Sequence, residues 1–217
     1  MRIKHGRVTL ALHELSRRDG PALLLLHALF GSSADWGEAP ATWPGAVFAL
    51  DFAGHGDSES VVGGAYYPEM LAGDADAALA HIGVAAIAGA GVGAYVALLL
   101  SGARRDSVPA ALLLPGAGLE GGGALPDWTR GFPRLDVGAR QPGACDPMVR
   151  ALECDVRPID YAAAFAGAAR RLLLAEEGQP RPPWWDAVRC SPSAEIVDGE
   201  LPAALRQLAT ATVTNNR

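Results

Sequence analysis

The chain has 217 residues, of which half are hydrophobic, 26 are glycine and 16 are proline. This is the composition of a globular protein rich in turns, and it excludes an intrinsically disordered chain. The net charge is -6, from 24 acidic and 18 basic residues, and the basic residues are scattered, so we expect no nucleic-acid partner.

The spacing of the cysteines and the composition of residues 1–20 indicate the cellular compartment. Cys145, Cys154 and Cys190 are odd in number and show neither a disulfide framework nor the paired spacing of a zinc site. The first 20 residues contain no uninterrupted apolar stretch of the kind that a secretory signal requires. We therefore predict a cytoplasmic protein that contains no metal and no other cofactor.

In chain order, short apolar runs alternate with longer segments of helical periodicity. Alternation of apolar and polar residues over 7–15 predicts an antiparallel strand. Continuous apolar runs predict buried strands at 22–26, 46–50, 84–88, 110–114, 171–175 and 194–197. Helical spacing predicts helices at 67–81, 93–102, 147–154, 159–169 and 201–212, and the glycine- and proline-rich segment 115–145 predicts a loop. This order predicts a doubly wound α/β fold of one domain, residues 1–217, with a mostly parallel sheet covered by helices on both faces.

The interval 82–103 contains no charged side chain and is long enough to span a membrane. Gly89, Gly91 and Gly93 interrupt it between a predicted strand and a predicted helix. We therefore predict a sharp strand-to-helix turn and no membrane span.

The same glycines fit a second pattern. Gly89, Gly91 and Ala94 satisfy the G-x-G-x-x-A spacing of dinucleotide-binding loops. That spacing requires an acidic residue for the ribose near the end of the next strand, where this chain has Pro115 and Gly116. A dinucleotide site therefore stands only as a minor alternative.

Three motifs follow predicted strands in a fixed order. They are HALFG at 27–31, DFAGHGDS at 51–58 and GAGVG at 89–93. In order and spacing they resemble the H-G loop, the D-x-x-G-x-G-x-S turn and the G-x-S-x-G nucleophile elbow of the α/β-hydrolase superfamily. The resemblance covers residues 5–214 and implies a ligand site at the carboxyl ends of the strands.

The resemblance also implies three catalytic positions, and each carries an unexpected residue. Gly91 stands at the nucleophile position, and Glu200 stands where the C-terminal histidine would be, since no histidine follows His81. Glu176 or Glu177 would have to serve as the acid. Without a nucleophilic atom or a base, acyl transfer has no route. The elbow also resembles that of the NDRG family, whose members share the fold and lack the nucleophile.

The remaining machinery consists of backbone groups. The resemblance places an oxyanion site at the amides of Val92 and Leu29, in a pocket formed with His27, Ala28 and Phe30. We expect these amides, at the positive end of a helix, to bind an anionic or carbonyl group. If they instead bond only within the protein or point into packed side chains, we expect the pocket to be lost and the protein to act through a protein partner.

Residues 117–169 are too few for a large lid, so we predict a reduced one. Asp155 within this segment is a candidate to face the pocket, with a solvated carboxylate at a helix start as the alternative.

The predicted function is that of an α/β-hydrolase-fold protein without hydrolase activity, which binds a small molecule or a protein partner. The first alternative is an enzyme of the superfamily, esterase-like or lyase-type, that uses unconventional residues around the elbow. The second alternative is the dinucleotide-binding protein.

Overall fold

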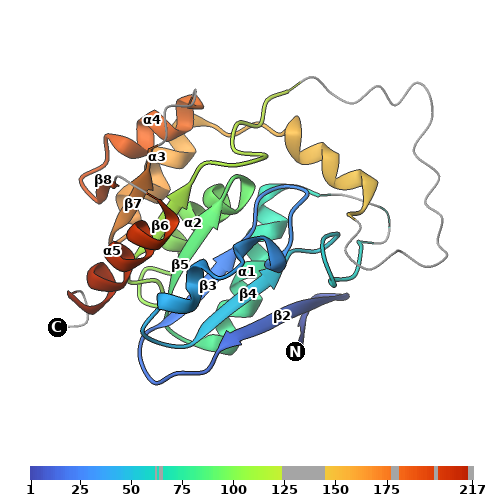
Figure 1. The fold of residues 1–217 in the computed structure, drawn as a ribbon. Helices are drawn as coiled ribbons and strands as arrows, with labels where there is room; N and C mark the ends of the chain where they lie inside the picture. The colour runs from blue at the N-terminus through green and yellow to red at the C-terminus, as the bar shows by residue number, and fades with distance from the viewer. Residues whose placement is uncertain (62, 64–65, 124–144, 177–180, 198–199, 215–217) are drawn as a thin grey trace.

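The structure is a computed structural model that describes residues 1–61, 63, 66–123, 145–176, 181–197 and 200–214. Eight strands form one sheet in the order β1-β2-β4-β3-β5-β6-β7-β8 (Figure 1). The strands are β1 Arg2–His5, β2 Val8–Ser16, β3 Ala22–Leu26, β4 Val47–Asp51, β5 Ala85–Ala90, β6 Ala111–Leu114, β7 Leu172–Ala175 and β8 Ala194–Val197. The β1–β2 and β2–β4 pairs are antiparallel, and every other pair is parallel.

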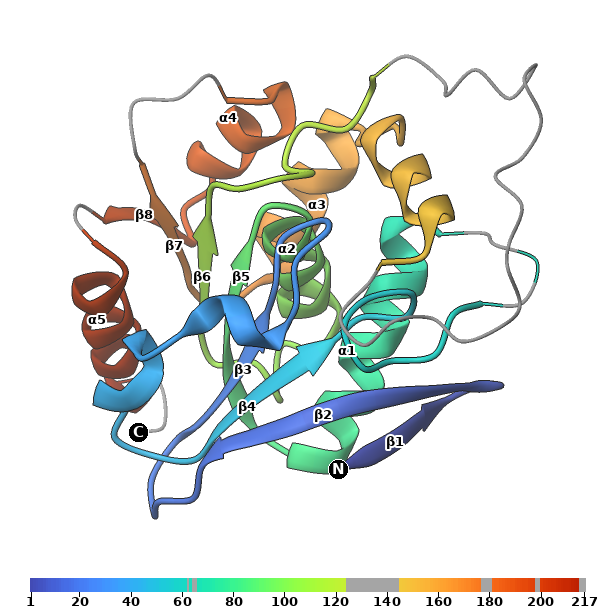
Figure 2. The ribbon, with the colours of Figure 1, turned by 45° about the vertical axis from the view of Figure 1, so that its right-hand side comes forward.

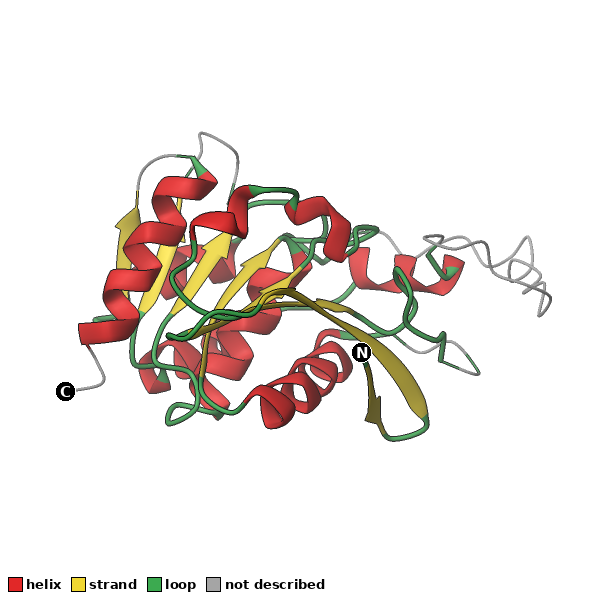
Figure 3. Ribbon diagram, turned by 60° about the horizontal axis from the view of Figure 1, so that its bottom comes forward, coloured by secondary structure: helices red, strands yellow, loops and turns green. Residues whose placement is uncertain are grey.

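Helices cover both faces of this sheet, as Figure 3 shows. The α-helices are α1 Pro68–Ile82, α2 Val92–Ala103, α3 Ile159–Ala168, α4 Pro183–Arg189 and α5 Leu201–Thr214. Short 3-10 helices lie at η1 Ser33–Trp36, η2 Ala39–Thr42 and η4 Pro147–Glu153. The predicted α/β fold, with a mostly parallel sheet and two helical layers, is confirmed.

The continuous apolar strands are explained by two separate cores. Alternate residues of β3 point to opposite faces: Leu24 packs in a core with α1 and α2, whereas Leu25 packs in a core with α5. Each strand residue is therefore buried on one face or the other, and the period-two pattern of a half-exposed strand disappears.

Two glycines of the elbow allow β5, α2 and β3 to approach one another. A Cβ atom on Gly89 would overlap the carbonyl oxygen of Gly93, and a Cβ atom on Gly93 would overlap that of Leu26. Backbone contacts this close exclude any side chain, so the glycines serve a packing role at the turn that the sequence predicted.

Each predicted strand and helix has a counterpart in the structure whose ends agree to within one or two residues, and η2 was not predicted. Segment 147–154 forms a 3-10 helix over most of its length, and the sequence missed both β1 and α4. Of the predicted loop 115–145, the part at 124–144 lies outside the described residues, as does much of the predicted lid. No helix within the described ranges is long and apolar enough to cross a membrane.

Candidate functional site

The elbow lies between β5 and α2, at the carboxyl end of the central strands. Gly91 adopts φ 56° and ψ -121°, a conformation that disfavours a side chain, and its amide donates to the carbonyl of Leu114 at 3.0 Å. A Cβ atom on Gly91 would overlap the carbonyl oxygen of Ala117 and lie 2.8 Å from the carbonyl carbon of Gly116. The nucleophile position therefore has the turn of an elbow but no room for a nucleophile.

Residues 115–123, which we call the covering loop, fill the space above Gly91. Figure 2 shows this yellow-green segment leaving β6 and crossing above the end of β5. Gly118 has φ 73° and Gly121 has φ 64°, so the path of the loop uses conformations that glycine adopts easily.

The two amides of the predicted oxyanion site meet at a single oxygen atom. Val92 N–H donates to the carbonyl oxygen of Ala117 at 3.0 Å, and Leu29 N–H donates to the same atom at 3.1 Å. Convergence of two backbone donors on one oxygen is the geometry of an oxyanion hole. Here the oxygen belongs to the protein, so neither amide is available to an external group in this structure.

The covering loop is fixed a second time, two residues further on. The carbonyl oxygen of Leu119 accepts hydrogen bonds from Arg157 and, at 3.0 Å, from the indole nitrogen of Trp184. Arg157 is buried and its guanidinium lies 5.0 Å from the ring centroid of Tyr95. Burial lowers the pKa of Arg157, and its position is stabilised by carbonyl oxygens and an aromatic ring.

His27 lies beside the elbow as a structural residue. Its Nε2 atom accepts from the amide of Phe52 at 3.1 Å, and its Nδ1 atom donates to the carbonyl of Ala28 at 2.7 Å. Burial lowers the pKa of His27, so the neutral ring is favoured. With both nitrogens engaged, this histidine is not placed to act as a base.

Asp51 holds its own motif, the segment just after the HALFG motif, and β2 together. Its carboxylate accepts from the amides of Ser33 at 2.7 Å and Asp57 at 2.8 Å, and it contacts His13 Nε2 at 3.0 Å. Burial opposes the charged form, but these donors together hold the pKa of Asp51 below its ordinary value. Potential metal-ligand atoms of His13, Asp51 and Asp57 lie within 4.8 Å of one another. Since hydrogen bonds already engage the Asp51 oxygens, we assign no metal role to this group.

The residues at the expected acid and histidine positions are engaged in other contacts. Glu176 follows β7 with 12% of its side chain exposed, and it forms ion pairs with Arg181 at 2.9 Å and Arg189 at 3.2 Å. Glu200 is exposed and its carbonyl oxygen accepts from Ala203 N–H at the start of α5. Glu177 lies outside the described residues.

Asp155 and Phe30, two further candidates, lie at the edges of the site. Asp155 is half-buried, and its carbonyl oxygen accepts from the amide of Gly122 in the covering loop at 2.6 Å. Phe30 has φ 65°, unusual for a residue with a side chain, and the residue is 45% exposed.

Two cavities flank the covering loop. The first, the His27 cavity, has a volume of about 260 Å³ and is lined by His27, Ala28, Asp35, Trp36, Ala90, Leu114, Pro115, Ala175 and Leu201. The second, the Glu176 cavity, has a volume of about 310 Å³ and lies against the covering loop, Glu153, Ala175, Glu176, Arg181 and Trp185. Pro115 and Ala175 line both cavities, so the two cavities are neighbours at the carboxyl ends of β6 and β7.

Sequence reasoning missed the residues that close the site. Neither Ala117 nor Arg157 lies in one of the three motifs at 27–31, 51–58 and 89–93. The glycine-rich stretch after the strand at 110–114 is the one signal that could have indicated a tightly packed loop there.

No protein-family model and no curated protein matches the chain. Solved structures are similar to it over nearly their whole length. They include Est1E from Butyrivibrio proteoclasticus with ferulic acid bound, at a TM-score of 0.69 and 17% identity, covering 100% of this chain and 99% of that one. A thermophilic esterase from Thermogutta terrifontis has a TM-score of 0.67 and 18% identity, covering 100% and 96%. An alpha/beta hydrolase from Sphaerobacter thermophilus has a TM-score of 0.67 and 16% identity, covering 97% and 99%.

Strand order, elbow geometry and these similarities agree. The chain has the α/β-hydrolase fold.

Proposed function

We propose that this protein uses the α/β-hydrolase fold for binding and does not hydrolyse esters or amides. The observation that carries the proposal is the position of Ala117. Its carbonyl oxygen accepts from both Val92 and Leu29, and it occupies the space that a side chain on residue 91 would need.

Acyl transfer in this fold needs a nucleophile, a base that removes its proton, and donors for the oxyanion. Gly91 supplies no nucleophilic atom, and Glu200 stands at the histidine position. The ion pairs of Glu176 with two arginines support a structural role for the residue at the acid position. The donors for the oxyanion, Val92 and Leu29, are bonded to Ala117. The nucleophile, the base with its acid, and the oxyanion donors therefore all count against hydrolysis.

Small-molecule binding is supported by the His27 cavity, which survives beside the blocked elbow. About 260 Å³ next to the carboxyl ends of β3, β5, β6 and β7 is enough for a compact ligand. A group bound at the Val92 and Leu29 amides would have to displace Ala117, so the cavity is the better site. The engaged Val92 amide also counts against the dinucleotide alternative, because a phosphate would need the N-terminus of α2.

The test is chemical. The purified protein is treated with a fluorophosphonate probe and assayed with p-nitrophenyl acetate, and we expect no labelling and turnover at the rate of denatured protein. Stoichiometric labelling of a serine, or saturable ester turnover, would instead support the alternative of an esterase-like enzyme with unconventional residues.

A protein partner is the second candidate function. The closed amides favour it, because they leave no donors for an external anionic group, and exposed apolar side chains occur at the start of α3. Val156 is 78% exposed and Ile159 is 52% exposed. A photo-crosslinking side chain at Val156, introduced in the native cells, should then capture one protein that the same group at Val84, 54% exposed before β5, does not capture.

A further inference from the structure

We propose that the His27 cavity binds a small organic cation with a compact apolar body, whose ammonium group contacts Asp35 and Trp36. The inference rests on the proposed binding function and names the ligand class for the same site. It departs from the anionic or carbonyl ligand that the sequence suggested.

The wall of the cavity is mostly apolar and carries no positive charge. Lysine and arginine are absent from its described lining, and His27, the one basic residue there, has both ring nitrogens engaged and a lowered pKa. The body of the ligand would contact Leu114, Pro115 and Leu201. These side chains favour an aliphatic or aromatic ring.

Asp35 is the single acidic residue in this lining, and its position is fixed locally. The Asp35 Oδ2 atom accepts from the amide of Ser32 at 2.9 Å in a capping box at the start of η1. A Cβ atom on residue 31 would overlap the same oxygen, so Gly31 gives the carboxylate its place. Among the described residues, no lysine, arginine or histidine forms an ion pair with Asp35. Asp35 is exposed to solvent and lines the cavity, so its negative charge lies at the solvent-accessible part of the lining.

Trp36, the next residue in the chain, adds an aromatic side chain to the same lining. The residue is 5% exposed and lines the same cavity. A carboxylate next to an indole ring is suited to an organic ammonium, which gains an ion pair and a cation–π contact together.

Anionic ligands are disfavoured at the same point. The two backbone donors that would hold a carboxylate are bonded to Ala117, and Asp35 would repel it. The net charge of -6 also attracts cations to the surface.

The test compares three ligands that share one apolar body: cyclohexylmethylammonium, cyclohexylmethanol and cyclohexanecarboxylate. Affinities are measured by calorimetry, and the site is located by chemical-shift changes of the Trp36 indole N–H. We expect the ammonium to bind most tightly, the alcohol more weakly and the carboxylate weakest.

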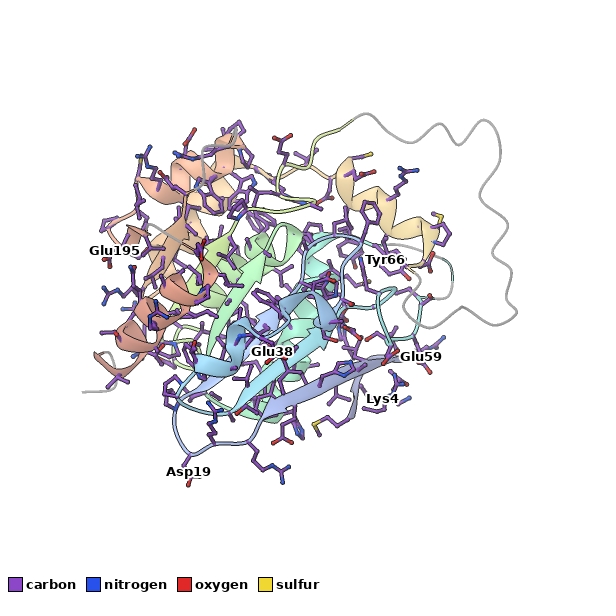
Figure 4. The ribbon with its side chains drawn as sticks, viewed as in Figure 1. Lys4, Asp19, Glu38, Glu59, Tyr66 and Glu195 are labelled. Carbon is purple, nitrogen blue, oxygen red and sulfur yellow. The ribbon has the colours of Figure 1, made fainter. Side chains whose placement is uncertain are left out.

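Two variants separate the local charge from the net charge. Asp35→Asn keeps an acceptor for the Ser32 amide and removes the charge, so it should weaken ammonium binding about fivefold and leave the alcohol unchanged. Asp19→Asn changes the net charge equally at an exposed position before the amino end of β3, labelled in Figure 4, whereas the cavity lies at the carboxyl ends of the strands; this variant should change neither affinity. Circular dichroism checks that both variants are folded.

The proposal is overturned if the carboxylate binds as tightly as the ammonium, if Asp35→Asn leaves ammonium binding unchanged, or if none of the three ligands shifts the Trp36 signal. Each of these results leaves the hydrolase assays unaffected, so failure of the ligand class is distinguishable from failure of the proposed function.

Discussion

The carbonyl oxygen of Ala117 occupies the position that a Cβ atom on Gly91 would take. An atom added at the Cα of Gly91 in the direction of a side chain would overlap that oxygen. A side chain can therefore be introduced at residue 91 only if the covering loop moves away.

The first prediction concerns Gly91→Ser. A side chain at φ 56° is strained, and here it also meets backbone, so we expect a loss of about 3 kcal/mol in the free energy of unfolding. Gly6→Ser is the matched control, since Gly6 has φ 58° and a Cβ atom there would have no neighbour within 4 Å, and it should cost about 1 kcal/mol. Urea denaturation measures both. Equal losses would show that the overlap with Ala117 is relieved at no cost.

The same variant should remain inactive towards activated esters. The new hydroxyl would have no free histidine nitrogen to accept its proton, because His27 beside the elbow has both ring nitrogens engaged and no histidine follows His81 in the chain.

A second prediction concerns the hydrogen bonds that hold the covering loop. Trp184→Phe removes one of the two donors to the Leu119 oxygen, so the loop should open more often. We expect hydrogen exchange of the Val92 and Leu29 amides to accelerate about fivefold, a fold-change that corresponds to about 1 kcal/mol for one hydrogen bond. Exchange of the Leu24 amide in the core should change less.

Trp43→Phe provides the control for this experiment. It removes an equivalent bond, from the Trp43 indole to the carbonyl of Pro21 at 2.6 Å, at the amino end of β3. Exchange at Val92 should follow only the global stability in this variant. If both variants affect Val92 alike, the Leu119 contact is not what closes the site.

The third prediction is a dependence of stability on pH. Burial raises the pKa of Asp155 to about 6, although the charge of Arg157 lowers it. The native state therefore binds this proton more tightly than the unfolded chain, in which the pKa is near 3.8. The stabilisation is complete below pH 3.8 and is lost as the pH rises through about 6.

Because Asp155 is only half-buried, solvent screening limits the effect to about 1 kcal/mol. Asp155→Asn should flatten the change in unfolding free energy between about pH 4 and pH 7, measured by urea denaturation at each pH. Asp160→Asn, at an exposed position in the first turn of α3, should leave the slope as it is. A slope unchanged by Asp155→Asn would show that another group titrates.

The fourth prediction separates a structural role from a catalytic one at Glu176. Glu176→Gln leaves Arg181 and Arg189 without their shared partner, so we expect a loss of about 2 kcal/mol in unfolding free energy. Glu153→Gln breaks the exposed pair with Arg150 and should cost less than about 0.5 kcal/mol. Equal and small losses would show that the two arginines do not need Glu176.

Most of the fold could be predicted because buried segments consist of apolar residues, which are visible in the sequence. Leu23 to Leu26 form a continuous apolar run since alternate side chains enter two different cores. β1 left no such mark, because only Ile3 of its four residues is buried and its pairing with β2 is made by backbone. α4 has seven residues, too few to display a helical period.

The resemblance to the α/β-hydrolase superfamily implied the backbone donors at Val92 and Leu29, whereas the elbow turn and the missing side chain at Gly91 could be derived from the sequence itself. Those features depend on residue type and on neighbours in the chain. What the two donors bind depends instead on the folded arrangement. Ala117 is an alanine in a glycine-rich loop, and its contribution is a carbonyl group that every residue possesses. Arg157 and Trp184 bind the carbonyl oxygen of Leu119, and this contact fixes the position of the loop that carries Ala117. Because these residues are far apart in the chain, their contacts produce no local sequence pattern.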